Sequence, residues 1–227
     1  MPSRTIFPST RAKSPCSSEY CTGVVEVKVG EGHNATSFFL HTGLLGFYSG
    51  YFHAALKRHF LSKSDGMIKL PEEDVDTFRI FVTWLYTGQI SFAEPGKVYP
   101  KLLALWAFAD RRGIPLLMNE AINAILMEYL ITLQLPTRRL CEVYELTVPG
   151  AGLRRLVVHL ISHQWNAKTF MAECGKMELP PDAYRDILCA VWRLKDERGA
   201  ERMKLWEVGQ VCEFHEYEEG VKCENAV

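Results

Sequence analysis

The order of strand and helix patterns between residues 24 and 92 constrains the fold more than any other feature of this chain. Apolar residues alternate with polar ones over Val25–Val29, which is the period of a strand with one buried face. A turn-rich stretch leads to a second strand at 38–41, so these two strands form a hairpin. A third apolar run follows at 67–70 and stops before a proline. The sequence therefore predicts a small sheet of three strands.

Helical spacing fills the gap between the second and third strands and continues after the third. Apolar residues in the gap recur every three or four positions and are interrupted at Ser49–Gly50, which predicts two short helices joined at a bend. Asp74 suits a helix N-cap and Gly88 a helix end, so an amphipathic helix is predicted between them. Phe78 and Leu85 lie on its apolar face, and we expect both in the core.

The rest of the chain is predicted to be helical, with breaks at Gly113 and Pro136. Apolar residues at helical spacing form five further stripes: Leu102, Leu105, Trp106 and Ala109; Leu117, Met118, Ala121 and Ile125; Leu140, Val143 and Tyr144; Leu153, Leu156, Val157, Leu160 and Ile161; Tyr184, Ile187, Leu188, Val191 and Trp192.

Seven short sequence words occur here in a fixed order: Val27–Gly30, Phe39–His41, Leu44-Leu45, Ser49–Phe52, Ile68–Asp74, Phe78 and Trp84–Gly88. Together they resemble the BTB/POZ domain, in the short form that is common in filamentous fungi. The resemblance implies an α+β fold: a small three-stranded sheet with a cluster of helices, followed by an all-α extension. It also implies a protein-docking module rather than a catalyst.

These patterns divide the chain into four parts. Residues 1–22 are rich in Ser, Thr, Pro and basic residues, and we expect them to form a flexible tail. Residues 23–131 are assigned to the BTB/POZ domain and residues 132–206 to the helical extension. Residues 207–227 are assigned to an acidic C-terminal tail that we expect to be loosely ordered.

Composition argues against several classes of function. The 227 residues carry a net charge of −1, so no basic field recruits nucleic acid. We interpret Arg111-Arg112, Arg138-Arg139 and Arg154-Arg155 as solvated helix ends or surface pairs. No apolar run approaches the ~18 residues that a membrane span needs. The seven cysteines are irregularly spaced and no signal sequence precedes them, which indicates free thiols in a reducing compartment, cytoplasmic or nuclear.

Three histidines are candidates for chemistry. His41 ends the second predicted strand, and the resemblance implies that it is buried and bonded to backbone rather than catalytic. His159 and His163 are four residues apart on a predicted helix, so they share a face and are able to chelate a metal. No third ligand is evident nearby, and the alternative is a pair of half-exposed helix histidines.

Cys212, His215 and Cys223 form a second candidate group. Cys-x-x-His is a natural chelate spacing for zinc, and Cys223 offers a third soft ligand. Tyr217 stands where similar fungal proteins tend to carry a second histidine, which removes a fourth ligand. The alternative is an acidic tail without metal, and we assign no catalytic, cofactor or metal residue.

The word Phe60-Leu61-Ser62 bears on the choice of partner. In BTB adaptors of cullin–RING ubiquitin ligases, the corresponding place holds a hydrophobic residue, any residue, and then glutamate. Phe60 keeps the hydrophobic residue, whereas Ser62 lacks the carboxylate, and Phe60 has an alternative place in the helical core. Val24 stands where many dimerising animal BTB domains have an aspartate that helps to bind co-repressors, so that activity is not expected.

The leading interpretation is therefore a non-catalytic adaptor that uses its BTB domain to bind a second copy of itself or another protein. The first alternative is a substrate adaptor of a cullin–RING ligase that binds the cullin near Phe60 and Ser62. The second is a metal-dependent or thiol enzyme built on the C-terminal Cys/His group, for which nothing upstream offers an oxyanion site.

Overall fold

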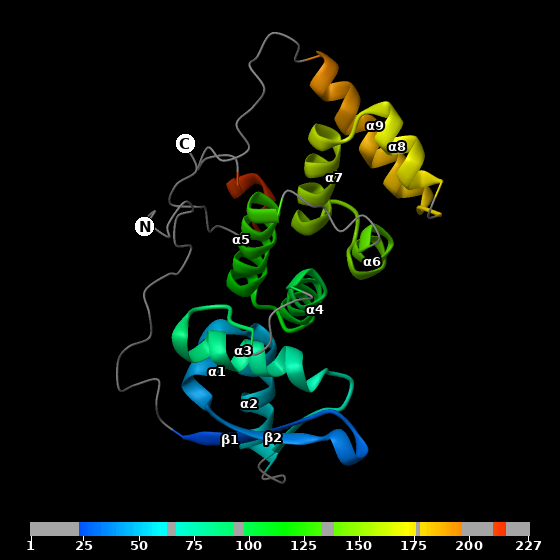
Figure 1. The fold of residues 1–227 in the computed structure, drawn as a ribbon. Helices are drawn as coiled ribbons and strands as arrows, with labels where there is room; N and C mark the ends of the chain where they lie inside the picture. The colour runs from blue at the N-terminus through cyan, green and yellow to red at the C-terminus, as the bar shows by residue number, and fades with distance from the viewer. Residues whose placement is uncertain are drawn as a thin grey trace. The chain divides into compact units, whose positions relative to one another are not determined.

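The computed structural model describes residues 23–62, 67–92, 98–132, 139–175, 178–196 and 211–216, with backbone alone at 59–62 and 195–196. The described residues form two compact units that meet in the chain between Ala121 and Ile122 (Figure 1). Each unit is described separately.

A three-stranded sheet forms one side of the N-terminal unit. Its strands β1 (Val24–Val29), β2 (Thr36–His41) and β3 (Met67–Leu70) lie in the order β2-β1-β3. Strand β1 pairs antiparallel with β2 and parallel with β3. A short 3-10 helix, η2 (Gly32–Asn34), lies in the hairpin connection. The predicted sheet is confirmed, but β2 begins two residues earlier than expected because its first two residues also pair with β1.

The alternating valines of β1 bury one face of this sheet. Val25, Val27 and Val29 are at most 3% exposed. Helices α1 (Thr42–Tyr48), α2 (Gly50–Ser62) and α3 (Val75–Thr87) lie on that side of the sheet in Figure 1. The predicted bend at Ser49 separates α1 from α2. The opposite face of the sheet carries no helix among the described residues of the unit.

Helix α3 is fixed at both ends by the residues that predicted it. The Asp74 carboxylate accepts a hydrogen bond from the Thr77 N–H at 2.7 Å, and Gly88 closes the helix with a left-handed φ of 69°. The Phe78 ring packs against Phe38 of β2 and Phe108 of helix α4 (Val98–Arg111), with ring centroids 4.9 and 5.8 Å apart. Phe78 is fully buried, which confirms its predicted place in the core.

The C-terminal unit is helical in its described part. Helix α5 (Pro115–Thr132) contains the boundary, and the other elements are α6 (Leu140–Leu146), α7 (Gly152–Gln164), α8 (Ala167–Cys174), α9 (Pro181–Asp196) and the 3-10 helix η4 (Cys212–Phe214). The predicted stripes on α6 and α7 are buried. The predicted break at Pro136 lies outside the described residues.

Two features of this unit differ from the sequence-based expectation. The sequence did not predict helix α8, because no apolar stripe was recognised there. In the structure none of its residues is buried. Its start is instead set by Asn166, whose side chain accepts a hydrogen bond from the Thr169 N–H at 2.9 Å. On α9, Leu188 and Trp192 are 43% and 57% exposed, so the predicted stripe is wider than the face that packs.

Residues 211–216 are packed, so the expectation of a loosely ordered tail is wrong for this segment. Phe214 is 5% exposed, and a Cβ atom at Gly152 would collide with its carbonyl oxygen. Glycine at that position therefore allows the segment to approach α7. The Glu216 carboxylate accepts a hydrogen bond from the Gly152 N–H at 2.6 Å and so caps the first turn of α7.

Replacing Phe78 with Ala should destabilise the protein by about 3–5 kcal/mol, because a fully buried ring leaves a cavity. The matched control is Phe39→Ala, which removes a ring that is 68% exposed and should change stability by less than about 0.5 kcal/mol. Urea unfolding of both variants measures the difference. Equal losses for the two phenylalanines would show that the assignment of inner and outer sheet faces is wrong.

Candidate protein-interaction surface

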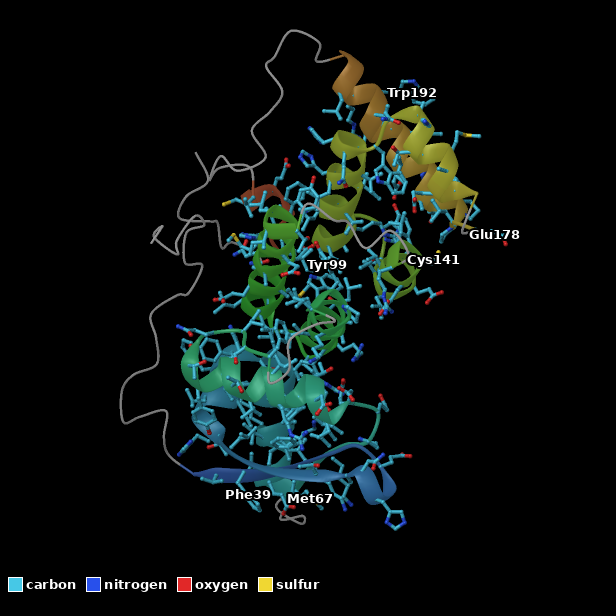
Figure 2. All side chains as sticks on the ribbon, viewed as in Figure 1. Phe39, Met67, Tyr99, Cys141, Glu178 and Trp192 are labelled. Atoms are coloured by element: carbon cyan, nitrogen blue, oxygen red, sulfur yellow. The ribbon has the colours of Figure 1, made fainter. Side chains whose placement is uncertain are left out.

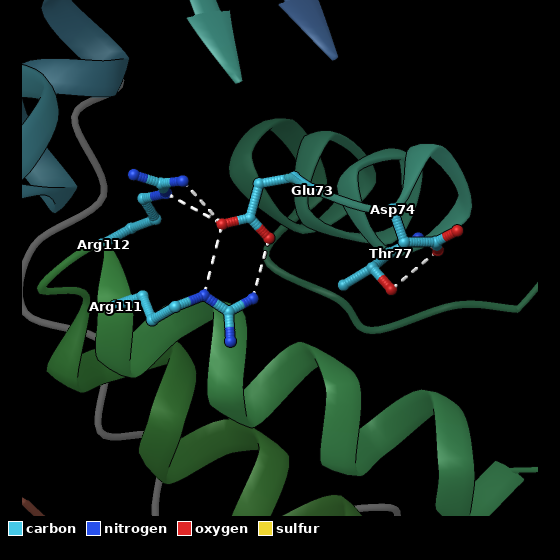
Figure 3. A network of polar contacts seen from close by, with 5 residues as sticks. All are labelled: Glu73, Asp74, Thr77, Arg111 and Arg112. Atoms are coloured by element: carbon cyan, nitrogen blue, oxygen red, sulfur yellow. Dashed lines mark hydrogen bonds and ion pairs between the residues drawn. The ribbon is translucent and has the colours of Figure 1, made fainter. Parts of the chain in front are cut away.

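The buried Glu73 carboxylate connects the start of α3 to the end of α4 (Figure 3). Glu73, directly before the N-cap of α3, is 4% exposed and accepts hydrogen bonds from two arginines at the end of α4. The shortest N–O distances are 2.8 Å to Arg111 and 2.6 Å to Arg112. Both guanidinium groups use two nitrogens, which fixes the direction of each side chain. The start of α3 is thereby bound to the end of α4.

Arg112 extends this connection to the junction between α1 and α2. Its guanidinium lies 4.4 Å from the centre of the Tyr51 ring, a cation–π contact. Its backbone carbonyl accepts a hydrogen bond from the Ser49 hydroxyl at 2.6 Å, and the Gly50 N–H donates to the Gly113 carbonyl at 3.3 Å. The N-terminal end of α2 is therefore held by the same loop that holds α3.

The interpretation of the arginine pairs as solvated is wrong for two residues. Arg112 is 8% exposed and Arg154 is 4% exposed. Arg154 donates to the Thr147 hydroxyl at 3.1 Å and to the Thr147 carbonyl, and it lies over the Tyr144 ring. Arg112 bonds to Glu73, 39 residues away, whereas Arg154 bonds to Thr147 and to the Tyr144 carbonyl, seven and ten residues away. The pairwise spacing of the arginines does not reveal these partners.

The face of the sheet opposite these helices exposes apolar side chains. The pairing places Phe39 beside Glu26, and Glu26 beside Met67, in one row across the three strands. Figure 2 shows Phe39 and Met67 on the side of the sheet away from the helices. Phe39 is 68% exposed and Val24 is 59% exposed. We call this surface the outer face.

Lysines border the apolar part of the outer face. The next row across the strands holds Ser37, Lys28 and Lys69, and both lysine side chains are exposed. The only carboxylate in these two rows is that of Glu26, which accepts a hydrogen bond from the Ser37 hydroxyl at 2.7 Å. An exposed phenylalanine beside two lysines is suited to a protein partner that supplies apolar and acidic groups.

His41 contacts the side chain of Tyr86 on α3. It is half-buried, and its ring nitrogen Nδ1 lies 2.9 Å from the Tyr86 hydroxyl oxygen, which also accepts the His41 backbone N–H at 3.2 Å. The His41 ring was expected to bond to backbone, but it bonds to the Tyr86 side chain instead. Tyr86 belongs to the Trp84–Gly88 word, but it was not predicted to be the partner of His41.

The proposed cullin-contact residues lie at the C-terminal end of α2. Phe60 and Ser62 fall in its last turn, but their side chains lie outside the described residues. Their role in binding stays a prediction. Val24, where an aspartate would mark a co-repressor pocket, is exposed at the start of β1 and lies opposite His41.

His159 and His163 lie side by side on α7, as their spacing predicted. Their ring centroids are 4.2 Å apart, and His163 Nδ1 lies 2.9 Å from the His159 carbonyl oxygen. Both line a cleft of about 520 Å³ between α7, α9 and η4. Burial and the neighbouring His163 lower the pKa of His159 to about 4, so its ring is neutral at pH 7. No group of three metal-ligating side chains occurs among the described residues.

The C-terminal Cys/His group is only partly described. His215 is 5% exposed, and its Nε2 lies 2.9 Å from the Asn123 side-chain oxygen. Burial lowers the pKa of His215 to about 4. Cys212 is half-buried, whereas Cys223 and Tyr217 lie outside the described residues. The hydrogen bond to Asn123 gives one ring nitrogen of His215 a role without metal, and zinc binding stays an untested alternative.

Comparison with known families matches residues 13–120 to the BTB/POZ domain. The chain carries a BTB/POZ domain. The match includes the whole sheet, the first four helices and the Glu73 contacts. BTB domains mediate protein–protein interactions and oligomerisation. A comparison with curated proteins found no match. In the described part of the chain, no helix is long and apolar enough to cross a membrane.

The sequence analysis missed two features of the BTB domain: the arginine partners of Glu73 and the exposed position of Phe39. Glu73 was read as part of a family word, without the arginine partners that lie 38 and 39 residues away. Phe39 was read as a strand residue, although strict alternation with buried Leu40 and the buried valines of β1 was available to place it on the outer face.

Replacing Glu73 with Gln should destabilise the protein by about 3 kcal/mol or more, because buried Arg112 loses its counter-charge. The matched control is Asp76→Asn, which breaks the exposed ion pair with Arg79 and should cost less than about 1 kcal/mol. Urea unfolding followed by circular dichroism compares them. Two small and equal effects would show that the Glu73 cluster does not hold these helices together.

Proposed function

We propose that this protein is a non-catalytic adaptor that binds other proteins through the sheet of its BTB domain. The observation that carries the proposal is the outer face, where Phe39 and Val24 are exposed on strands whose opposite face is largely buried. Apolar side chains on a rigid scaffold lose little conformational entropy on binding. An exposed phenylalanine can therefore serve as an anchor for a partner protein.

The chemistry of the outer face supports this proposal. Its described side chains offer apolar contact and lysine charge, and the Glu26 carboxylate is engaged by Ser37. Such a surface recognises a protein segment by apolar burial and by charge at the rim. The helical extension then adds a second surface, on which Leu188 and Trp192 of α9 are exposed.

Lysine-specific cross-linking in the native organism tests the proposal, because Lys28 and Lys69 are exposed on the outer face. We expect partner peptides to be linked to these two lysines, and Phe39→Ser to reduce those links by at least about tenfold. Lys168, exposed on α8, serves as the internal reference. Partner links that map to Lys168 and spare Lys28 and Lys69 would contradict binding through the sheet.

A substrate adaptor of a cullin–RING ligase is the alternative form of this function. It is supported by Phe60, which stands at the end of α2 where such adaptors carry a hydrophobic residue. Ser62→Glu should strengthen binding to a BTB-binding cullin by about 1 kcal/mol or more, since a carboxylate can form charge-assisted hydrogen bonds. Ser62→Gln, of equal size without the charge, is the control.

Titration calorimetry of the wild type and both Ser62 variants measures this difference. Binding that improves for Ser62→Glu alone would support a cullin-contact surface at the end of α2. No detectable heat for any of the three proteins would exclude the ligase form of the adaptor and leave the general form standing.

A further inference from the structure

Residues 211–216 lie against α7 as a bound peptide would, and we call them the docked segment. Phe214 and His215 are each 5% exposed, although the described segment is only six residues long. The Phe214 ring lies against that of His159 on α7, with centroids 5.3 Å apart. The Nε2 atom of His215 lies 2.9 Å from the side-chain oxygen of Asn123 on α5. A short segment is thus held by a few anchoring side chains.

Helix α7 contacts the main chain of the docked segment at two successive residues. The Arg155 guanidinium donates a hydrogen bond to the Glu213 carbonyl at 2.6 Å. The next carbonyl, that of Phe214, comes so close to Gly152 that a Cβ atom there would lie 1.9 Å from its oxygen. Gly152 does not have a left-handed φ, so glycine is needed here for space and not for conformation. Contacts to backbone carbonyls do not depend on which side chains the segment carries.

Charge selects the side chain at the end of the docked segment. The Glu216 carboxylate accepts a hydrogen bond from the Gly152 N–H at 2.6 Å, at the positive end of the α7 dipole. The first turn of α7 holds Arg154 and Arg155 and no acidic residue. An acidic side chain two residues after the aromatic anchor therefore matches this surface, whereas a basic side chain would meet like charge.

The docked segment leaves part of the surrounding space unfilled. A cleft of about 520 Å³ stays open beside it in the described part of the unit, lined by η4, α7 and α9. Val158 of α7 and Ala190 and Leu194 of α9 give this cleft apolar walls. Burial of further apolar surface in the cleft would add binding free energy that the docked segment does not have. A segment with larger apolar side chains can therefore compete with the docked one.

We call the surface formed by Asn123, Gly152, Arg155 and His159 the α7 site, and we propose that it docks a segment of a partner protein in competition with the docked segment. The partner that fits carries an aromatic residue and, two residues later, a glutamate or an aspartate. It binds only when the docked segment leaves, because the same Gly152 N–H and Arg155 guanidinium serve both. The α7 site lies in the helical extension, so this proposal goes beyond binding through the sheet.

Three substitutions in the full chain separate the α7 site from the docked segment. Phe214→Ala removes the aromatic anchor and so opens the site. Glu216→Gln weakens the same segment at a half-buried position, which keeps the test valid if Phe214→Ala does not fold. Gly152→Ala closes the site, since its Cβ atom would collide with the carbonyl of any segment that docks in the same way. Circular dichroism confirms that each variant is folded.

Fluorescence anisotropy with a labelled peptide of residues 211–216, in reducing buffer, measures binding to the full chain. We expect Phe214→Ala to bind this peptide at least about tenfold more tightly than the wild type, because a tethered segment competes at high effective concentration. Glu216→Gln should show a smaller gain, and adding Gly152→Ala to either variant should remove binding. No binding by either opened variant, or binding that Gly152→Ala leaves unchanged, would overturn the inference.

A random peptide library, selected on an opened variant and counter-selected on the same variant with Gly152→Ala, tests the chemistry of the partner. We expect the enriched peptides to share an aromatic residue that is followed two positions later by an acidic one. Enrichment of basic peptides, or no enrichment, would overturn the assignment. A wild type that dimerises in sedimentation and becomes monomeric with Gly152→Ala would show exchange of the docked segment between two copies, which would also overturn it.

Discussion

The contact between Glu73 and the two arginines is the constraint on which the rest of the N-terminal unit depends. One buried carboxylate fixes the start of α3 and the end of α4, and Arg112 extends the contact to the start of α2. Without the carboxylate, the buried guanidinium would lose its counter-charge at a cost of several kcal/mol. This charge cluster, together with apolar packing, holds in place the helices that support the inner face of the sheet.

A well-supported inner face explains why the outer face can stay exposed. The valines of β1 and the aromatic core around Phe78 hold the three strands from one side. Phe39 and the open edge of β2 therefore need no cover from within the described part of the domain. Adaptor function uses this property, because a rigid strand presents side chains and backbone groups at fixed positions.

The parts of the fold that sequence predicted are those set by local signals. The three strands, the bend at Ser49 and the caps of α3 follow from alternation, glycine and a capping aspartate within a few residues. Buried Arg112 and the packed segment 211–216 depend on partners far along the chain, which periodicity does not reveal. The family words identified the BTB domain, while the bounds of the four sequence-based parts and the cullin contact at Phe60 stay predictions.

Amide hydrogen exchange of β2, resolved by residue with NMR, tests most directly whether the sheet edge is an interaction surface. Phe38 and Leu40 bond to β1 and should be protected with and without a partner. We predict that the Ser37 and Phe39 amides exchange fast in the isolated protein and become protected when a partner identified by cross-linking is added. Exchange of these two amides that the bound partner leaves unchanged would contradict binding through the sheet.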